Sequence, residues 1–258
     1  MNNYWLLDRP IAHRGYHKKE DNIPENSLPA FKRAIEHNFN IELDVQLTKD
    51  NQVIVFHDHN VKRMTGKDSF IEKLTYAETQ QLNLDGVEGI HPPLLTDVLD
   101  LVKGQVGIVI EIKSLNHSPL FRLERYLNKI MKTYNGLYCI KSFSPFSVQW
   151  YFNHNHKVLR GFLTGFKQDF LNIIGTPIYP FSQFCSFNVE VLPQKRVENR
   201  FHKRNKPIIC WTVNSVEKIE TVKKYADNIV FERLEPEVVE AYYDYNKNIK
   251  KEYKDFKI

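Results

Sequence analysis

Two carboxylates spaced two residues apart are the first sign of chemistry in this sequence. Glu42 and Asp44 alternate with Ile41, Leu43 and Val45. On a β-strand this spacing puts both acidic side chains on one face, about 6–7 Å apart at Cα. The apolar flanks indicate a buried strand, where carboxylates repel one another unless they are paired or metal-bound. The pattern predicts a site for a hard divalent cation, Mg²⁺ or Ca²⁺, with an exposed strand bearing surface acids as the alternative.

The same spacing recurs further along the chain at Glu111 and Lys113, directly after the apolar residues 108–110. We expect this third carboxylate to complete the metal site with Glu42 and Asp44. The lysine would supply a positive charge for a phosphate group. Taken without the other residues, Glu111 and Lys113 are equally compatible with a local ion pair at the surface.

Groups that move protons and bind phosphate stand together near the N-terminus, where His13 and Arg14 precede Gly15. An imidazole titrates near neutral pH and can act as an acid or a base. A guanidinium offers a planar fork of donors to phosphate oxygens. A structural histidine is the alternative for His13 when the triplet is considered alone.

A second histidine, His57, ends the apolar segment Val53–His57. That segment follows the strand expected at Ile41–Gln46 after only six residues, 47–52. A parallel crossover needs about a dozen residues or more, so Val53–His57 must return antiparallel as a hairpin. The hairpin would carry His57 back toward the carboxylates of the first strand.

Apolar runs typical of strands alternate with helix-like segments along the whole chain. The other strands expected are Pro10–His13, Gly107–Lys113, Tyr138–Ser142, Val158–Leu163, Phe184–Asn188, Pro207–Val213 and Ile229–Glu232. Helices are expected at Leu28–His37, Leu95–Val102, Leu120–Tyr134, Val148–His154, Arg196–Lys203 and Val216–Tyr225. Apart from the hairpin strand, eight β/α repeats remain, which predicts an α/β fold of the TIM-type (β/α)8 barrel class. In such barrels the reacting groups collect at the C-terminal ends of the strands.

The expected domain organisation is simple. No internal repeat and no Pro/Gly/Ser-rich linker divides the chain, so residues 1–258 are predicted to form a single domain. The stretch between Asp58 and Leu94 contains several turn signals with glycine or proline. It predicts a small insertion after the hairpin, at about 58–94.

Composition argues against several classes of protein. The formal net charge is +5, but the densest basic tract, Lys247–Lys257, is interrupted by Glu252 and Asp255. A solvated helix face is therefore favoured over a nucleic-acid-binding arm. No window approaches the roughly 18 consecutive apolar residues of a membrane span, and the first residues do not resemble a secretory signal. The three cysteines lie in apolar stretches at unrelated spacings, which indicates reduced thiols and a cytoplasmic location.

The sequence resembles the glycerophosphodiester phosphodiesterase family, within the phospholipase-C-like phosphodiesterases. The resemblance covers most of the chain and is densest over residues 11–66. Its segments, in the order of the family, are Ala12-His13-Arg14-Gly15, Pro24-Glu25-Asn26-Ser27, Ile41-Glu42-Leu43-Asp44-Val45, Leu47-Thr48-Lys49-Asp50, Val55-Phe56-His57-Asp58, Met64-Thr65-Gly66, Glu111-Ile112-Lys113 and Trp211-Thr212-Val213-Asn214.

This resemblance implies a role for each of the residues singled out above. Glu42, Asp44 and Glu111 would bind one divalent cation. His13 and His57 would form the acid/base pair, in which one histidine removes the proton of the nucleophile and the other protonates the leaving oxygen. Which histidine does which stays open.

Arg14 and Lys113 would hold oxygens of the phosphate, as the resemblance also implies. Trp211, at the end of a predicted strand, is a candidate floor for the substrate pocket, with simple burial in the core as the alternative. Two positions depart from the family pattern. Asn38 stands where a glycine is usual after the first helix, and Glu232 stands near a more usual Thr-Asp ending, which leaves its role open.

The reaction that the resemblance implies is hydrolysis of glycerophosphodiesters to glycerol 3-phosphate and an alcohol. A hydroxyl of the substrate glycerol would attack phosphorus and give a cyclic phosphodiester that water opens; the sequence has no Gly-x-Ser-x-Gly elbow to supply another nucleophile. Two alternatives remain, a phospholipase-D-like lyase that releases the cyclic phosphate and a non-catalytic barrel that binds phosphodiesters. The sequence specifies neither the head group, nor the ion, nor the oligomeric state.

Overall fold

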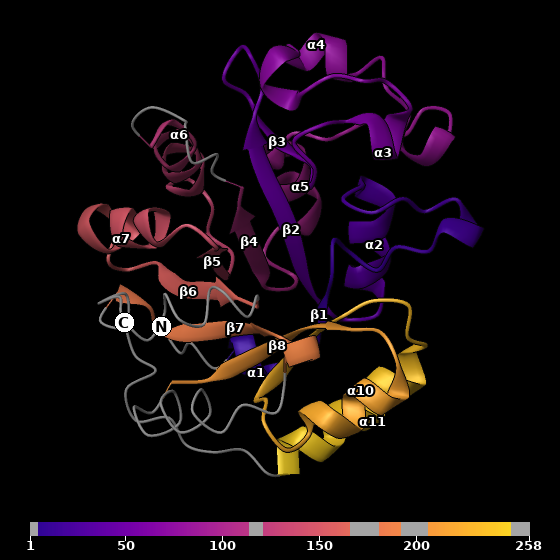
Figure 1. Ribbon diagram of the computed structural model, residues 1–258, viewed down its shortest axis with the longest axis vertical. Helices are drawn as coiled ribbons and strands as arrows, with labels where there is room; N and C mark the ends of the chain where they lie inside the picture. The colour runs from indigo at the N-terminus through magenta and orange to yellow at the C-terminus, as the bar shows by residue number, and fades with distance from the viewer. Residues whose placement is uncertain (1–4, 114–120, 166–180, 192–205, 249–258) are drawn as a thin grey trace. The chain divides into compact units, whose positions relative to one another are not determined.

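The computed structural model describes residues 5–113, 121–165, 181–191 and 206–248 (Figure 1). The chain divides into two compact units. The first unit comprises His13–Leu137, and the second comprises Met1–Ala12 together with Tyr138–Ile258. The single domain expected from the sequence remains a prediction.

A parallel pair of strands and a hairpin form the framework of the first unit. β2 (Asn40–Leu47) pairs in parallel with β4 (Ile108–Ile112) and antiparallel with β3 (Val53–Val55). The connecting loop is closed by Thr48, whose backbone amide donates to the Gln52 carbonyl oxygen at 3.0 Å and whose hydroxyl oxygen accepts from the Gln52 amide at 2.9 Å. The predicted hairpin is confirmed, although its second strand is shorter than expected and ends two residues before His57.

The longer helices of this unit begin close to the predicted positions. They are α2 (Leu28–Glu36), α5 (Leu95–Val102) and α6 (Arg122–Met131). At the start of α2 the side-chain oxygen of Ser27 accepts from the Ala30 amide at 3.3 Å. This cap satisfies one of the free N–H groups of the first turn, which is why the helix begins here.

The predicted insertion forms a small layer of short helical turns. Its elements are α3 (Lys62–Thr65), η2 (Ile71–Lys73), α4 (Tyr76–Thr79) and η3 (Leu84–Gly86). They enclose a hydrophobic cluster with the hairpin strand, made of Ile54, Phe56, Val61, Met64, Ile71, Leu74, Leu82 and Leu84. Figure 1 shows α4 near the end of β2 at which the strand arrow terminates. The residues after β3 are therefore held by a packed core of their own.

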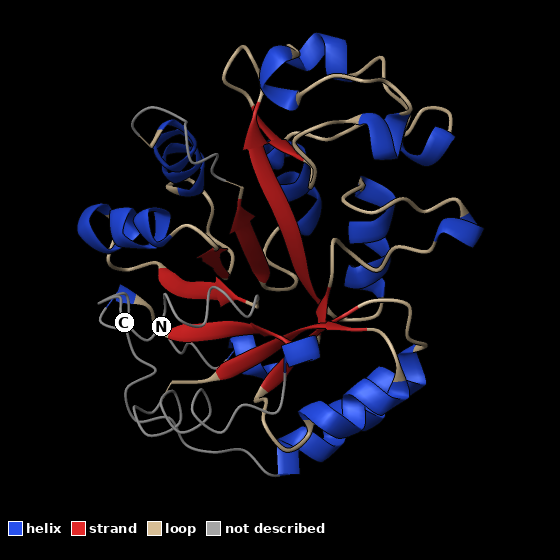
Figure 2. Cartoon of the chain, in the orientation of Figure 1, coloured by secondary structure: helices blue, strands red, loops and turns tan. Residues whose placement is uncertain are grey.

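The second unit contains a run of parallel strands, coloured red in Figure 2 with its helices in blue. Its strands are β1 (Ile11–Ala12), β5 (Tyr138–Ser142), β6 (Leu159–Thr164), β7 (Phe184–Asn188), β8 (Ile208–Val213) and β9 (Asn228–Phe231). Neighbours follow the order β1-β9-β8-β7-β6-β5. Together with β2 and β4 they account, in the described part of the chain, for the eight strands predicted.

Helical elements and buried cysteines complete this unit. The helical elements are α1 (Trp5–Asp8), α7 (Pro145–His154), η5 (Val189–Val191), α10 (Val216–Val222) and α11 (Pro236–Asn248). The helix expected at Arg196–Lys203 and most of the basic tract Lys247–Lys257 lie outside the described residues. All three cysteines, Cys139, Cys185 and Cys210, are buried free thiols.

A turn at Gly15, before α2, is hydrogen-bonded to both α2 and β2 of the first unit. Gly15 has φ +81°, its amide donates to the Glu42 carbonyl oxygen at 3.2 Å, and the next amide, of Tyr16, donates to the Ala30 carbonyl oxygen at 3.0 Å. A side chain at Gly15 would bring its Cβ to 2.8 Å from the Cβ of Ala30. The left-handed backbone and the close approach both require glycine here, and they fix the turn that carries His13.

Gly15→Ala is expected to destabilise the protein more than Gly66→Ala. Gly66 also has a left-handed backbone, φ +75°, but open space at its Cβ position. An alanine in this conformation costs roughly 1–2 kcal/mol at either site, and the contact with Ala30 adds at least about 1 kcal/mol at position 15. Urea unfolding gives both free energies, and equal losses would contradict the packing argument.

Candidate active site

Three buried carboxylates meet on the β2–β4 pair. Asp44 is paired in register with Glu111, and Glu42 lies two residues before Asp44 on the same face of β2. One oxygen from each carboxylate lies within 4.8 Å of the others, and the three residues are only 0%, 1% and 5% exposed for Glu42, Asp44 and Glu111. The structure thus brings together the three acids that the sequence predicted, and parallel register is the reason.

Two cations contact this acidic cluster. The Nζ of Lys113 lies 3.1 Å from an Asp44 oxygen and also pairs with Glu111, and the Nε of Arg14 lies 3.5 Å from the other Asp44 oxygen. Burial alone would raise the pKa of Asp44, but the charges of Lys113 and Arg14 outweigh it and hold the pKa below its usual range. Burial would lower the pKa of Lys113, and the neighbouring carboxylates raise it instead. Asp44 and Lys113 therefore form an ionised pair within the site.

Neutral donors orient the same carboxylates. The side-chain amide of Asn26 donates to Asp44 Oδ2 at 2.9 Å, and the Asp44 amide donates to the Asn26 oxygen at 3.3 Å. The backbone amide of Arg14 donates to Glu42 Oε2 at 3.0 Å. These contacts tie the loop before α2 to β2. Sequence reasoning considered Asn26, with Ser27, as a capping residue of the following helix and did not predict its contact with Asp44.

The peptide bond that joins His13 to Arg14 contacts the acidic cluster. His13 follows β1 and is half-buried, and its peptide bond supplies the Arg14 amide that Glu42 accepts. The turn continues through Gly15, which also bonds to β2. The backbone of His13 is thus held beside Glu42, as the predicted clustering of these residues requires.

His57 lies just beyond β3, held by its backbone and by its ring. The Gln46 side-chain amide donates to the carbonyl oxygens of Phe56, His57 and Asp58 at 2.9, 3.1 and 2.8 Å. The Phe56 amide donates to the Asp44 carbonyl oxygen at 3.0 Å, so the turn starts next to the acidic cluster. The ring Nδ1 of His57 lies 2.5 Å from Asp58 Oδ1. The sequence pattern located His57 but did not assign a role to Gln46.

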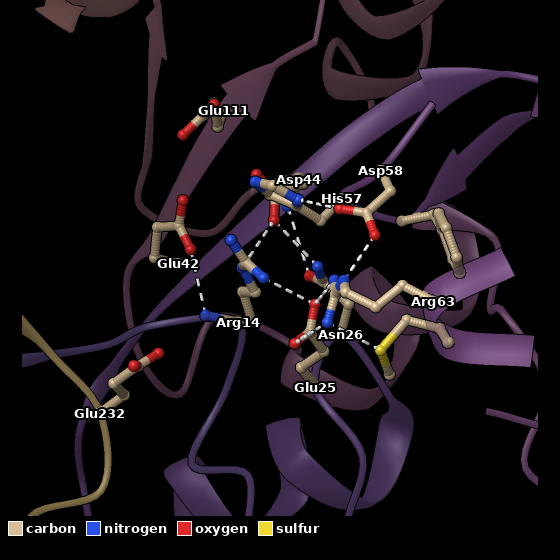
Figure 3. Close-up of polar contacts among 12 residues, drawn as sticks. Arg14, Glu25, Asn26, Glu42, Asp44, His57, Asp58, Arg63, Glu111 and Glu232 are labelled. Atoms are coloured by element: carbon tan, nitrogen blue, oxygen red, sulfur yellow. Dashed lines mark hydrogen bonds and ion pairs between the residues drawn. The ribbon is translucent and has the colours of Figure 1, made fainter. Parts of the chain in front are cut away.

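An ion-pair network links His57 to Arg14 (Figure 3). Asp58 accepts from Arg63 Nε at 2.5 Å, and the two terminal nitrogens of Arg63 donate to the two oxygens of Glu25 at 3.0 and 2.6 Å. Glu25 also accepts from Arg14 at 2.7 Å. Burial would raise the pKa of Glu25, but its contacts with the two arginines lower it. Sequence reasoning missed this network, because nothing in the spacing links positions 25 and 63.

The remaining predicted residue, Trp211, belongs to the second unit. It lies on β8, where its ring meets Phe143 edge to face with centroids 5.7 Å apart. A role for Trp211 in substrate binding stays a prediction. Of the two departures noted above, Asn38 has φ 59°, the left-handed conformation that asparagine tolerates in place of glycine. The backbone amide of Glu232 donates to the Val213 carbonyl oxygen at 3.1 Å.

The donor set fits a hard divalent cation. Three carboxylates offer oxygen ligands from one buried face, which is the ligand type that Mg²⁺ and Ca²⁺ prefer. All three donors are carboxylate oxygens, which are hard ligands rather than the thiolates that soft metals prefer. In chemical terms the cluster offers oxygen ligands to one such cation.

Solved structures share this fold. An Oleispira antarctica phosphodiesterase, solved in complex with the product sn-glycerol-3-phosphate, matches with a TM-score of 0.78 and 20% identity, over 95% of this chain and all of that one (100%). A glycerophosphodiester phosphodiesterase from Thermotoga maritima matches with a TM-score of 0.70 and 25% identity, over 90% of this chain and 95% of that one. The chain therefore has the predicted TIM-type (β/α)8 fold with its insertion.

Sequence comparison identifies the family. A sequence model of the glycerophosphoryl diester phosphodiesterase family matches residues 13–231. A glycerophosphodiester phosphodiesterase of Caldanaerobacter subterraneus is 36% identical over 148 residues, which are 54% of this chain and 59% of that protein. The chain belongs to the glycerophosphoryl diester phosphodiesterase family, and the enzyme class predicted from the sequence, a phosphoric diester hydrolase, is confirmed at the level of the family. In the described ranges, no helix is long and apolar enough to cross a membrane.

Gln46→Leu is expected to destabilise the protein by about 1–3 kcal/mol, because three carbonyl oxygens beside His57 lose their shared donor. Gln80→Leu is the matched control, since Gln80 donates one bond, to the Pro92 carbonyl oxygen at 2.9 Å. Gln80→Leu should therefore lower the free energy of unfolding by about 0.5–1.5 kcal/mol. Urea unfolding measures both variants, and a larger loss for Gln80→Leu would show that Gln46 does not hold the turn.

Proposed function

We propose that this protein hydrolyses glycerophosphodiesters to glycerol 3-phosphate and an alcohol, with the help of one divalent cation. The observation that carries the proposal is the meeting of three buried carboxylates with two cations on the β2–β4 pair. A purely structural cluster of this kind would be costly, because buried charges lose their hydration. Family membership gives the reaction class, and the cluster supplies the groups that this reaction needs.

The charge of the site supports the proposal. Five carboxylates (Glu25, Glu42, Asp44, Asp58 and Glu111) stand with three cations (Arg14, Arg63 and Lys113) in one connected set of contacts. With both histidines neutral, this set carries two excess negative charges. One Mg²⁺ or Ca²⁺ ion would neutralise that excess, and a bound phosphodiester would then meet a site that is no longer anionic.

Binding and orientation of the phosphate fall to Arg14 and Lys113 in this proposal. Arg14 presents a planar fork of donors, and Lys113 is a compact point charge at the end of β4. A cation held by Glu42, Asp44 and Glu111 would stabilise negative charge on the phosphoryl oxygens. Both basic side chains already lie beside carboxylates of this cluster, so the phosphate would sit over the same face of the sheet.

Proton transfer falls to His13 and His57. One imidazole would take the proton of a substrate hydroxyl as it attacks phosphorus, and the other would protonate the leaving oxygen. The resulting cyclic phosphodiester would be opened by water with the roles reversed. The assignment of acid and base to the two histidines is left open by the geometry, since both follow strands of the barrel.

Two further points belong to the same proposal. Trp211 would contribute to the substrate pocket. The protein would act on a small-molecule glycerophosphodiester in the cytoplasm, in keeping with three free thiols. Phosphorus NMR of the products distinguishes hydrolysis from the lyase alternative: glycerol 3-phosphate supports the proposal, and a cyclic phosphate that persists contradicts it.

His13→Ala and His57→Ala should each lower kcat for glycerophosphocholine hydrolysis by about 10²–10⁴, the usual contribution of a positioned acid or base. His154→Ala is the control, because His154 is exposed on α7 and its Nδ1 bonds to the Trp150 carbonyl oxygen of the same helix at 2.8 Å. A steady-state assay with several diesters measures the effect. Unchanged turnover in both histidine variants would overturn the mechanism.

Mg²⁺ or Ca²⁺ should raise the unfolding temperature of the protein through the acidic cluster. A free ion concentration of 100 times the Kd corresponds to about 2.7 kcal/mol of added unfolding free energy. Asp44→Asn should abolish the shift, whereas Asp68→Asn should retain it, because Asp68 is an exposed residue of the insertion that pairs with Lys62. Calorimetry with and without chelator makes the measurement; an equal shift in both variants would place the ion elsewhere.

A further inference from the structure

Arg63 links Asp58, the partner of His57, to Glu25, the partner of Arg14, yet it lies in the insertion. It is the second residue of α3, between the buried Val61 and Met64 of the insertion core. Its side chain extends from that helix to Asp58 and Glu25 and pairs with both carboxylates (Figure 3). Of these two partners, Asp58 touches His57 and Glu25 touches Arg14.

We infer that Arg63 is a positioning residue of this active site, a clamp in the insertion that orients His57 through Asp58 and Arg14 through Glu25. The inference rests on the proposed function, because it concerns the acid/base histidine and the phosphate-binding arginine of that site. It gives the insertion a task in catalysis, although none of its own side chains is assigned to bind the substrate.

The branch through Asp58 selects the tautomer of His57. Contacts with His57 and Arg63 lower the pKa of Asp58 against the effect of burial, so its carboxylate can only accept hydrogen bonds. The ring Nδ1 of His57, 2.5 Å from Asp58 Oδ1, must therefore be the donor. A neutral His57 then presents Nε2 with a free lone pair, the form that a base requires. Without a fixed Asp58 the ring loses both its orientation and this tautomer.

The branch through Glu25 fixes the direction of Arg14. Glu25 Oε1 accepts from Arg14 at 2.7 Å and from Arg63 at 2.6 Å, so one oxygen joins the two guanidinium groups. Glu25 Oε2 accepts from Arg63 at 3.0 Å, which makes the contact bidentate. With one terminal nitrogen held by Glu25 and Nε beside Asp44, Arg14 has a defined orientation toward the acidic cluster.

Only an arginine can make both contacts. Its Nε serves Asp58, while its two terminal nitrogens serve the two oxygens of Glu25, in the fixed fork of a guanidinium. A lysine would keep the charge but could not hold two carboxylates in defined directions. An exposed single ion pair contributes little, but a bidentate contact within a network is the exception to that rule.

The first test compares Arg63→Ala, Arg63→Lys and the control Lys62→Ala. Lys62 is the neighbouring residue on α3, and its Nζ lies 3.3 Å from a carboxylate oxygen of the exposed Asp68. Nitrogen-15 NMR of histidine-labelled protein, at a pH where the ring is neutral, reports the tautomer of His57 without any need for turnover. We expect Nδ1–H in the wild type and in Lys62→Ala, and a shift toward Nε2–H in both Arg63 variants. An unchanged tautomer in Arg63→Ala would overturn the inference.

The second test is kinetic. Arg63→Ala and Arg63→Lys should each lower kcat by about 10–100-fold, the range for residues that orient the groups of a site. Arg63→Ala should also weaken binding of sn-glycerol 3-phosphate, measured by calorimetry, because Arg14 is no longer directed. Lys62→Ala should keep both values, and urea unfolding shows whether any loss follows from stability alone.

A final comparison separates the clamp from a general structural role. In a protein that already carries Asp58→Asn and Glu25→Gln, Arg63→Ala should cause no further loss of kcat, because its two routes to the site are gone. A full additional loss in that background would contradict the inference. If the wild type proves inactive on diesters, the proposed function fails, while the NMR comparison still decides whether Arg63 orients His57.

Discussion

Mutual repulsion among three buried carboxylates is the constraint on which this site depends. Glu42, Asp44 and Glu111 lie on one face of two neighbouring strands with almost no access to water. Such a group persists only if positive charge lies close by, since desolvated anions raise each other's free energy. Lys113 and Arg14 supply part of that charge, and the excess that remains is what a divalent cation would neutralise.

The surrounding structure can be understood as the means of placing charges around that cluster. The short hairpin returns the chain to β2, so His57 emerges beside Asp44 instead of on a distant strand. The glycine turn after β1 sets the Arg14 amide on Glu42. Arg63 of the insertion then pairs with Asp58, which contacts His57, and with Glu25, which contacts Arg14. Neutral and charged contacts together orient Asp44, His57 and Arg14.

Much of this arrangement was predictable from sequence, for identifiable physical reasons. The two-residue spacing of Glu42 and Asp44 determines a shared face on any strand, and a six-residue connection excludes a parallel crossover before His57. The parallel register that sets Asp44 beside Glu111 could only be expected from the fold class.

Contacts formed by long side chains were not predictable in the same way. Arg63 meets Glu25 across 38 positions of sequence, and the pairing depends on how the insertion packs. Gln46 looked like an ordinary strand residue, although its amide holds the turn that carries His57. The end of β3 at Val55 likewise reflects that turn, which periodicity alone does not reveal.

The central claim is that the buried carboxylates form a cation site. A crystal structure of the protein grown with Mn²⁺, with anomalous scattering data, tests it most directly. The account predicts one strong anomalous peak within about 2.6 Å of an oxygen of Glu42, of Asp44 and of Glu111. A protein that is active in the presence of Mn²⁺ but shows no peak at these three residues would contradict it.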